Sequence, residues 1–358
     1  MTTSRRRHAV ALGAVLALAT ALVGVPAHAA PSTATGSAAT AATAATAGRA
    51  ADTQVQHVRV SWKGTQRSPD YVQTATIPGI GTLDLVCKPH DTRIRLTTDR
   101  RDRETQMWLQ KYEVKKGKRV VAVKTARIYR WAHADDDGRG GTGLSAQEGL
   151  NQSSGVENRS QGGFMYGVVS QQSSRAEAGG QVTAPLPVTT FELDWNWNGF
   201  DHPQKYRSCS IDATFTTTLP AYQRTVLTWR GWQAEPRTTR TTSVPGVGRL
   251  TVSCPSAPTP DDPAQVWVEP TTSDSRLYVE DVRGEGLLTT QRTTSSLGYD
   301  AATGRLGPYP LPTNGSLRML ATNGAVERWI LLSAYRVTGD RHGPDRDLCE
   351  VAAGAYAR

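Results

Sequence analysis

The chain contains one sequence pattern twice, and this repeat limits the possible folds more than any single motif. The matching segments are Trp62–Gly64 with Trp229–Gly231, Pro78–Leu83 with Pro245–Leu250, and Cys87 with Cys254. All three pairs are 167 residues apart (62 to 229, 78 to 245 and 87 to 254), so the match needs no gap. We therefore expect two copies of one domain, at 55–220 and 221–358, and two copies are too few for a solenoid.

The four cysteines divide evenly between the two copies, with one early and one late in each. A bond within each copy is the simplest of the three pairings that four cysteines allow, and it joins Cys87 to Cys209 and Cys254 to Cys349. Each bond would stabilise its copy by about 2 to 4 kcal/mol. The sequence has no C-x-x-C pair, and oxidised sulfur is neither a nucleophile nor a metal ligand, so we expect structural cysteines.

Apolar residues around the cysteines alternate with polar ones, which is the period of a half-buried β-strand. Leu83, Leu85 and Cys87 fall on one strand face, and Cys209 and Ile211 fall on another. We predict an all-β protein of two tandem antiparallel β-sandwich domains, each with one internal disulfide and at most short helices. The first copy has the longer cysteine spacing, and we place the excess in a long loop at about 132–187.

The N-terminal segment, residues 1–29, has the three parts of a secretory signal peptide. Arg5–Arg7 precede an apolar run over Ala9–Val25, and Ala27–Ala29 (AHA) supplies a small-x-small cleavage site. An uncleaved anchor helix is the alternative, but the run is short for a bilayer span and no basic stop-transfer cluster follows it. Residues 30–54 are rich in Ala and Thr, so we expect a disordered tail. The mature protein would be extracellular, with no membrane attachment after cleavage.

The charge of the chain argues against a nucleic-acid partner. Lys and Arg number 41 and Asp and Glu number 32, which gives a formal net charge of +9, and three of the arginines lie in the expected signal. The remaining excess of about +6, spread over the mature chain, favours solubility and weak attraction to anionic surfaces. It falls short of the clustered basic surface of a nucleic-acid binder.

Two groups of residues are candidates for ligand binding. Trp195 and Trp197 share a face of a predicted strand, and flat indole rings are good platforms for sugar rings, with core packing as the alternative. The second group is basic and surrounds a predicted hairpin at Gly117, and it consists of Lys115, Lys116, Lys118 and Arg119. An anionic wall polymer could bind there, although a solvated hairpin tip has the same composition.

Acidic residues give two further hypotheses. Asp135, Asp136 and Asp137 bring three carboxylates to a turn, which would suit a weak calcium site, with an acidic hairpin tip as the alternative; no other cofactor is indicated. Glu192 and Asp194 lie on one face of a predicted strand about 7 Å apart, a separation that glycosidase carboxylates can use. The outward face of an amphipathic strand predicts the same two residues without catalysis. We assign no catalytic residue.

The Ala/Thr/Arg-rich composition, the signal and the Pro-Gly-x-Gly-x-Leu-x-x-x-Cys repeats at Pro78 and Pro245 resemble uncharacterised secreted tandem-repeat proteins of high-GC actinobacteria. The resemblance covers both copies but implies no activity, and it carries over no functional residue. We expect a secreted, non-enzymatic binding protein with a polysaccharide or another cell-envelope surface as its partner. One alternative is a secreted hydrolase with its site on the long loop of the first copy. The other is an extracellular inhibitor or structural protein.

Overall fold

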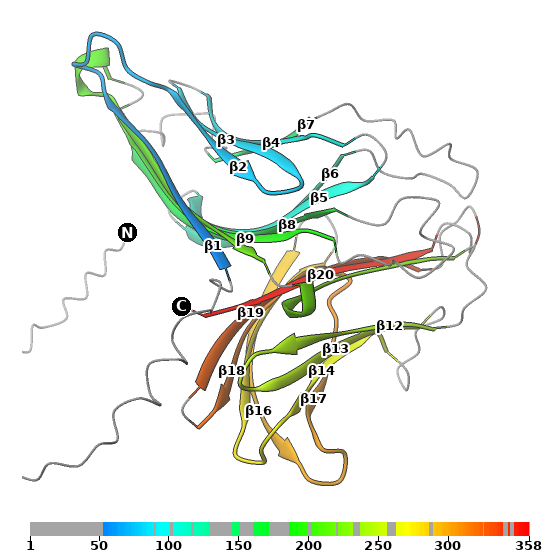
Figure 1. Cartoon of the computed structure of the whole chain (residues 1–358). Coiled ribbons are helices and arrows are strands. Elements are labelled where there is room, and N and C mark those ends of the chain that lie inside the picture. Colours follow the sequence, from blue (N-terminus) through cyan, green and yellow to red (C-terminus); the bar gives the residue numbers. More distant parts are fainter. Residues whose placement is uncertain are drawn as a thin grey trace, which may run out of the picture. The chain divides into compact units, whose positions relative to one another are not determined.

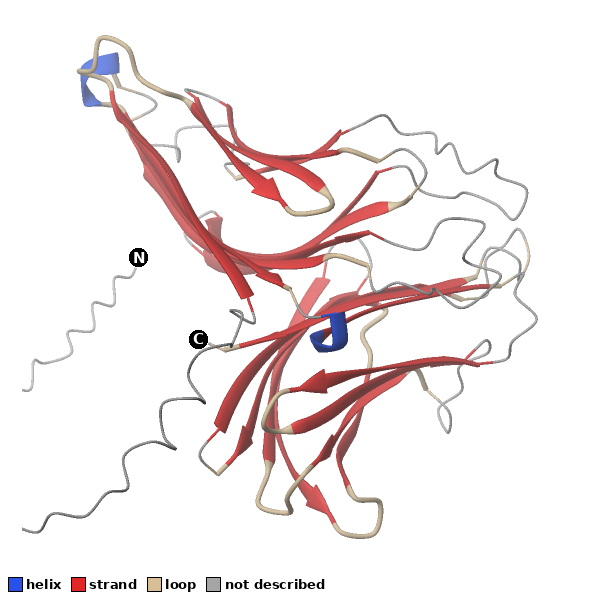
Figure 2. Cartoon of the chain, in the orientation of Figure 1, coloured by secondary structure: helices blue, strands red, loops and turns tan. Residues whose placement is uncertain are grey.

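A computed structural model describes the chain over residues 53–88, 91–100, 103–115, 118–128, 145–150, 160–171, 186–199, 202–219, 221–231, 237–255, 263–285, 289–324, 326–338, 343 and 347–357. Over these ranges the regular structure is all strand apart from two short 3₁₀ helices, η1 (Gln204–Tyr206) and η2 (Ala221–Gln223) (Figure 2). The prediction of an all-β protein with at most short helices is confirmed. The expected signal peptide lies outside the described residues.

The first half of the chain, 53–219, forms two antiparallel sheets (Figure 1). A six-stranded sheet has the order β1 (Thr53–Lys63), β10 (Ser208–Thr218), β9 (Val188–Asn198), β8 (Ser160–Gln171), β5 (Thr105–Lys115), β6 (Lys118–Ile128). A four-stranded sheet has the order β2 (Val72–Ile77), β3 (Gly81–Lys88), β4 (Asp91–Thr98), β7 (Ser145–Gly149).

The second half, 221–357, forms one ten-stranded antiparallel sheet. Its first six strands are β11 (Arg224–Arg230), β20 (Leu348–Tyr356), β19 (Val326–Val337), β18 (Asn314–Asn323), β15 (Arg276–Glu285) and β16 (Thr289–Asp300). The last four are β17 (Arg305–Pro310), β14 (Gln265–Pro270), β13 (Gly248–Pro255) and β12 (Arg237–Val244). A short pairing of β16 with β17 joins the two groups. The two halves have the same strand order. When ten is subtracted from each label, the first six strands become β1, β10, β9, β8, β5 and β6, which is the order of the six-stranded sheet. The last four become β7, β4, β3 and β2, which is the order of the four-stranded sheet read in reverse.

Each half buries one apolar core between its six-strand group and its four-strand group. The alternation of side chains along the strands produces these cores, because successive residues point to opposite faces. On β10, Cys209, Ile211, Ala213 and Phe215 face the first core as the sequence predicts. Trp62 and Trp229, which recur between the matched segments, are both buried in these cores.

The repeated Pro-Gly motif forms the same turn in both halves. Gly79 has φ +71° and Gly246 has φ +76°, backbone conformations that suit glycine. The amide of Ile80 donates to the carbonyl of Ile77 at 3.0 Å, and Val247 bonds Val244 in the same way at 2.9 Å. Proline before a glycine of positive φ is the signature of a type II turn, and here it connects β2 to β3 and β12 to β13.

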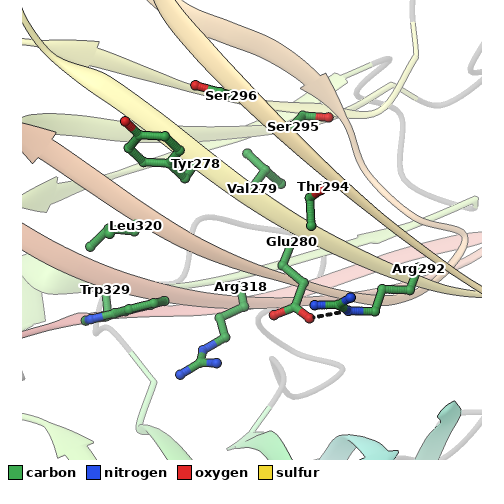
Figure 3. Close-up of a pocket in the computed structure, with 10 residues that line it drawn as sticks. All are labelled: Tyr278, Val279, Glu280, Arg292, Thr294, Ser295, Ser296, Arg318, Leu320 and Trp329. Atoms are coloured by element: carbon green, nitrogen blue, oxygen red, sulfur yellow. Dashed lines mark hydrogen bonds and ion pairs between the residues drawn. The ribbon is translucent and has the colours of Figure 1, made fainter. Parts of the chain in front are cut away.

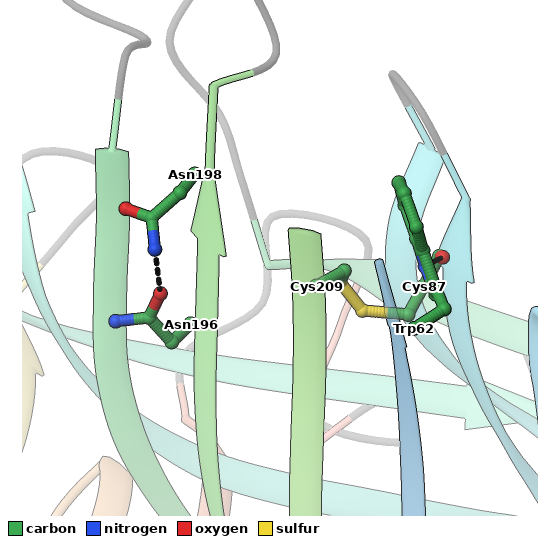
Figure 4. Close-up of a disulfide and its surroundings, with 5 residues drawn as sticks. All are labelled: Trp62, Cys87, Asn196, Asn198 and Cys209. Carbon is green, nitrogen blue, oxygen red and sulfur yellow. Dashed lines mark hydrogen bonds between the residues drawn. A yellow bond between two sulfur atoms is a disulfide. The ribbon is translucent and has the colours of Figure 1, made fainter. Parts of the chain in front are cut away.

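The two disulfides have the expected pairing. Cys87 bonds Cys209, with 6.0 Å between the Cα atoms, and Cys254 bonds Cys349, with 6.2 Å between theirs. Each bond joins an inner strand of the four-strand group to a strand of the six-strand group across the core. Trp62 lies beside the first bond, and its indole N–H donates to the carbonyl oxygen of Cys87 (Figure 4). The cysteines are therefore part of the cores.

A third apolar cluster forms between the faces of the two six-strand groups that point away from their own cores, called here the outer faces. It contains Trp108, Tyr166, Val168, Leu186 and Val188 of the first half and Val226, Leu331, Ala352 and Tyr356 of the second. Gly354 on β20 lets these faces approach, because a Cβ there would lie 3.0 Å from Thr218 Oγ1 and 3.4 Å from a methyl carbon of Val188. The outer faces are thus packed against each other.

The prediction of one long loop over 132–187 is wrong in part, because β7 and β8 lie within it. The sequence of β8 is rich in glycine for a steric reason. A Cβ on Gly163 would lie 2.5 Å from the ring of Trp195, and one on Gly167 would lie 2.5 Å from the ring of Phe191. The glycines make room for two large rings of β9 and do not mark a loop. Thr53 and Gln54, which the prediction assigned to the tail, belong to β1.

Candidate functional site

One hollow among the described residues lies on the outer face of β15, β16, β18 and β19. The antiparallel register places Ser296, Tyr278, Leu320 and Trp329 opposite one another in one row across these strands. The neighbouring row on the same face contains Thr294, Glu280 and Arg318. The residues between the two rows along each strand, such as Val279 and Met319, belong to the core. The alternation of each strand therefore directs a mixed aromatic and polar set outward.

These two rows line a pocket of about 480 Å³. Among the described residues, its lining consists of Tyr278, Val279, Glu280, Arg292, Thr294, Ser295, Ser296, Arg318, Leu320 and Trp329. Figure 3 shows Tyr278, Leu320 and Trp329 at one end, Glu280 with Arg292 at the other, and Arg318 between Trp329 and Glu280. The pocket thus has an aromatic end and a charged end.

Arg318 is held in place from both halves of the chain. Its guanidinium lies 4.5 Å from the ring centroid of Trp329 and 5.2 Å from that of Tyr166. It also donates to a carboxylate oxygen of Glu192 on β9 at 3.1 Å. Stacking on two rings and pairing with a carboxylate suit the flat, delocalised arginine cation. Together these contacts fix the orientation of the cation beside the exposed part of Trp329.

Glu280 is fixed in the same way at the charged end. Its carboxylate accepts from Arg292 Nε at 2.6 Å and from the Tyr112 hydroxyl at 3.1 Å. Because the Tyr112 hydroxyl donates its hydrogen bond to Glu280, its oxygen accepts one from the Tyr166 hydroxyl at 2.9 Å. Burial raises the pKa of both phenols, and the hydrogen bond that Arg292 donates to Glu280 raises the pKa of Arg292. The tyrosines are therefore neutral donors and the arginine is a cation at neutral pH.

This arrangement is suited to binding a polar ligand that has an apolar face. The partly exposed ring of Trp329 and the exposed ring of Tyr278 offer flat apolar surfaces. Glu280 and Arg318 offer hydrogen-bonding groups whose orientation is already set. Glycoside hydrolysis uses two carboxyl groups, and Glu280 is the one acid among the described residues of this lining.

The interpretation of Trp195 and Trp197 as an exposed sugar platform is wrong. The two side chains are only 3% and 1% exposed and belong to the first core. They share a strand face with Phe191 and Leu193, and the apolar character of that face turns it inward. Core packing, the alternative weighed for these residues, is the observed role.

The other sequence candidates fall largely outside the described part. In the basic group at Lys115, Lys116, Lys118 and Arg119, the backbone of Lys115 pairs with that of Lys118, and Arg119 pairs with Val114, at the hairpin between β5 and β6. Lys116 lies outside the described residues. Asp135, Asp136 and Asp137 lie outside the described residues. In the part of the chain that is described, no group of three or more His, Cys, Asp or Glu could hold a metal ion.

Glu192 and Asp194 share the outer face of β9 as predicted, but they have different surroundings. Glu192 bonds Arg318, whereas Asp194 is exposed and lies opposite Asp212 on β10. Partial burial, with the nearby charges of Asp212 and Glu192, raises the pKa of Asp194. Neither acid lines the pocket that contains Trp329.

Sequence reasoning missed Tyr278, Glu280, Arg292 and Arg318, and it assigned Trp329 to no site. A local signal was present in β15, where Tyr278 and Glu280 alternate with the apolar residues Leu277 and Val279. The register between strands could not be read from the sequence, and the register is what assembles the row.

Comparisons of the chain with protein-family models, curated proteins and solved structures found no match. Among the residues that the structure describes, none of the helices is long and apolar enough to cross a membrane.

Proposed function

We propose that the chain is a secreted, non-enzymatic binding protein whose pocket on β15, β16, β18 and β19 takes a carbohydrate, as part of a polysaccharide or another component of a cell envelope. The single observation that carries this proposal is the partly exposed ring of Trp329, stacked against an oriented Arg318 at the rim of a pocket. Two disulfides, and no membrane-spanning helix in the described residues, are compatible with export.

The chemistry of a sugar ring matches this pocket in two ways. One face of a pyranose is a patch of C–H groups, which packs on an aromatic ring, and its edge carries hydroxyls that both donate and accept. Arg318 supplies donors, the Glu280 carboxylate supplies acceptors, and Thr294 and Ser296 supply both. Arg318 and Glu280 are already held by the contacts described above. Binding of a ligand would therefore cost little side-chain entropy at these two groups.

We further propose that the two halves are tandem β-sandwich domains derived from one ancestral copy. Support comes from the equal spacing of the matched segments and from a strand order that is the same in the two halves. Each proposed domain has its own core and its own disulfide. The proposed domain boundary falls between β10 and β11, and the interface uses the outer faces.

The test is retention of the purified secreted protein on insoluble cell-wall material, chitin and cellulose, at low and at high salt. We expect retention that survives high salt, because screening weakens charge attraction far more than ring stacking. Trp329→Ala and Tyr278→Ala should each weaken binding at least tenfold, which corresponds to about 1.4 kcal/mol. Tyr206→Ala is the matched control, since Tyr206 is an exposed aromatic on η1 and is absent from the pocket lining.

Two results would contradict the proposal. The first is an absence of retention on every matrix. The second is retention that Trp329→Ala and Tyr206→Ala leave equally intact, because binding would then occur elsewhere on the chain.

A further inference from the structure

A second, smaller hollow lies on the outer face of the first half. Its volume is about 210 Å³, and it is lined by Val55, Thr190, Phe191, Glu192, Thr214, Thr216, Tyr356 and Ala357. Most of these residues come from β1, β9 and β10, while Tyr356 is the last residue of β20 and Ala357 follows it. Val55 is 51% exposed and supplies an apolar patch beside a row of threonine hydroxyls. This mixture of apolar and hydroxyl groups again suits a sugar.

Two contacts connect this hollow to the pocket that contains Trp329. Glu192 lines the smaller hollow, Arg318 lines the larger, and these two side chains form an ion pair at 3.1 Å. Trp329 lines the larger pocket, and its cross-strand partner on β20 is Tyr356, which lines the smaller. The two hollows therefore have adjoining walls, and each draws on both halves of the chain for residues or for the contacts that hold them.

The span of the two hollows exceeds what one sugar ring would fill. The larger pocket crosses β16, β15, β18 and β19, three strand spacings or about 14 Å. The smaller crosses β1, β10 and β9, two spacings or about 10 Å. A ligand confined to one hollow would leave the other polar and aromatic wall in water, whereas a chain molecule can contact both.

We infer that the two hollows are subsites of one groove for an extended glycan chain, with the Arg318–Glu192 ion pair at their junction. This inference rests on the proposed function, and it adds that the ligand is recognised as a polymer over several consecutive sugars. A chain that occupies both subsites gains the second set of contacts without a second loss of translational freedom, so its affinity rises with length.

The experiment compares a disaccharide and a hexasaccharide by isothermal titration calorimetry, using both the N-acetylglucosamine and the β-1,4-linked glucose series. We expect the full-length secreted protein to bind the hexasaccharide of one series at least tenfold more tightly than its disaccharide. The variant Val55→Gln/Thr214→Gln places longer side chains in the smaller hollow at positions that are not buried. It should lower hexasaccharide affinity about tenfold and leave disaccharide affinity unchanged.

Ser61→Gln is the control, because Ser61 is exposed on the same face of edge strand β1 and is absent from the lining of both hollows. Equal affinity for the two lengths, or a Val55→Gln/Thr214→Gln variant that binds the hexasaccharide normally, would overturn the groove. If Trp329→Ala still abolished binding in that case, the proposed carbohydrate site would stand without it. If neither length of either series bound, both the groove and the proposed function would be overturned.

Discussion

Replacing Lys111 by Met tests whether a charged pair inside the first core holds its two sheets together. Lys111 lies on the core face of β5 with its side chain fully buried, and its ammonium donates to Glu148 Oε1 on β7 at 2.9 Å. It also donates to the carbonyl oxygen of Gly149 at 2.9 Å. Since β5 and β7 belong to different sheets, these contacts cross the core.

The expected cost of Lys111→Met follows from burial of the charge that remains. Removing one partner of a buried ion pair costs about 3 to 5 kcal/mol, because the other charge stays desolvated without compensation. The Glu148 side chain is 13% exposed, which allows some solvation, so we expect the lower end, about 3 kcal/mol. Glu148→Leu should cost at least as much, because it leaves the fully buried ammonium. The double variant Lys111→Met/Glu148→Leu should recover most of the loss, since apolar replacement of a buried pair is often neutral.

The assay is equilibrium urea unfolding at pH 7, followed by tryptophan fluorescence and far-ultraviolet circular dichroism. Lys63→Met is the matched control, because Lys63 is exposed on β1 and its substitution should change stability by less than about 0.5 kcal/mol. The reasoning is refuted if Lys111→Met costs less than about 1 kcal/mol. It is also refuted if the double variant loses the sum of the single losses, because the two groups would then act independently.

Two further predictions concern the outer faces. Gly354→Ala should lower stability by about 1 kcal/mol or more in thermal unfolding, because its Cβ would press on Thr218 and Val188; an unchanged midpoint would show that the faces can separate freely. Asp194→Asn should raise stability at pH 7 by a few tenths of a kcal/mol, because Asp194 lies opposite Asp212 and its pKa is raised in the folded state. A carboxyl group whose pKa is raised in the folded state destabilises the fold at pH values where the group is ionised. The stability gained by Asp194→Asn should therefore vanish as the pH falls below the folded and the unfolded pKa of Asp194. A gain that persists at pH 2 would contradict an electrostatic cause.

The strand faces could be predicted because the alternation that defines them is local. Leu83, Leu85 and Cys87, and likewise Cys209 and Ile211, point inward as their two-residue period indicates. The same rule, applied consistently, places Trp195 and Trp197 in the core together with their apolar neighbours on β9. Reading them as a surface platform gave more weight to a chemical property of indole than to the pattern of the strand.

The missed features are non-local. The glycines of β8 look like loop residues until the rings of Trp195 and Phe191, which belong to another strand, are placed over them. The row from Ser296 to Trp329 likewise depends on the pairing of four strands, and its two ends come from different hairpins. Neither fact follows from the neighbours of a residue along the chain.

The position of the candidate site gives a physical reason for the two halves to occur in one chain. The pocket residues belong to the second half, but Arg318 is oriented by Glu192 and Tyr166, and Glu280 by Tyr112, all from the first half. The second half alone would expose these charged groups to water and would lack the contacts with Glu192, Tyr166 and Tyr112 that help to orient them. Under the proposed duplication, the matched residues retain the core and the turns, and the outer faces have diverged to hold each other's side chains. Binding would thus be a property of the junction between the copies.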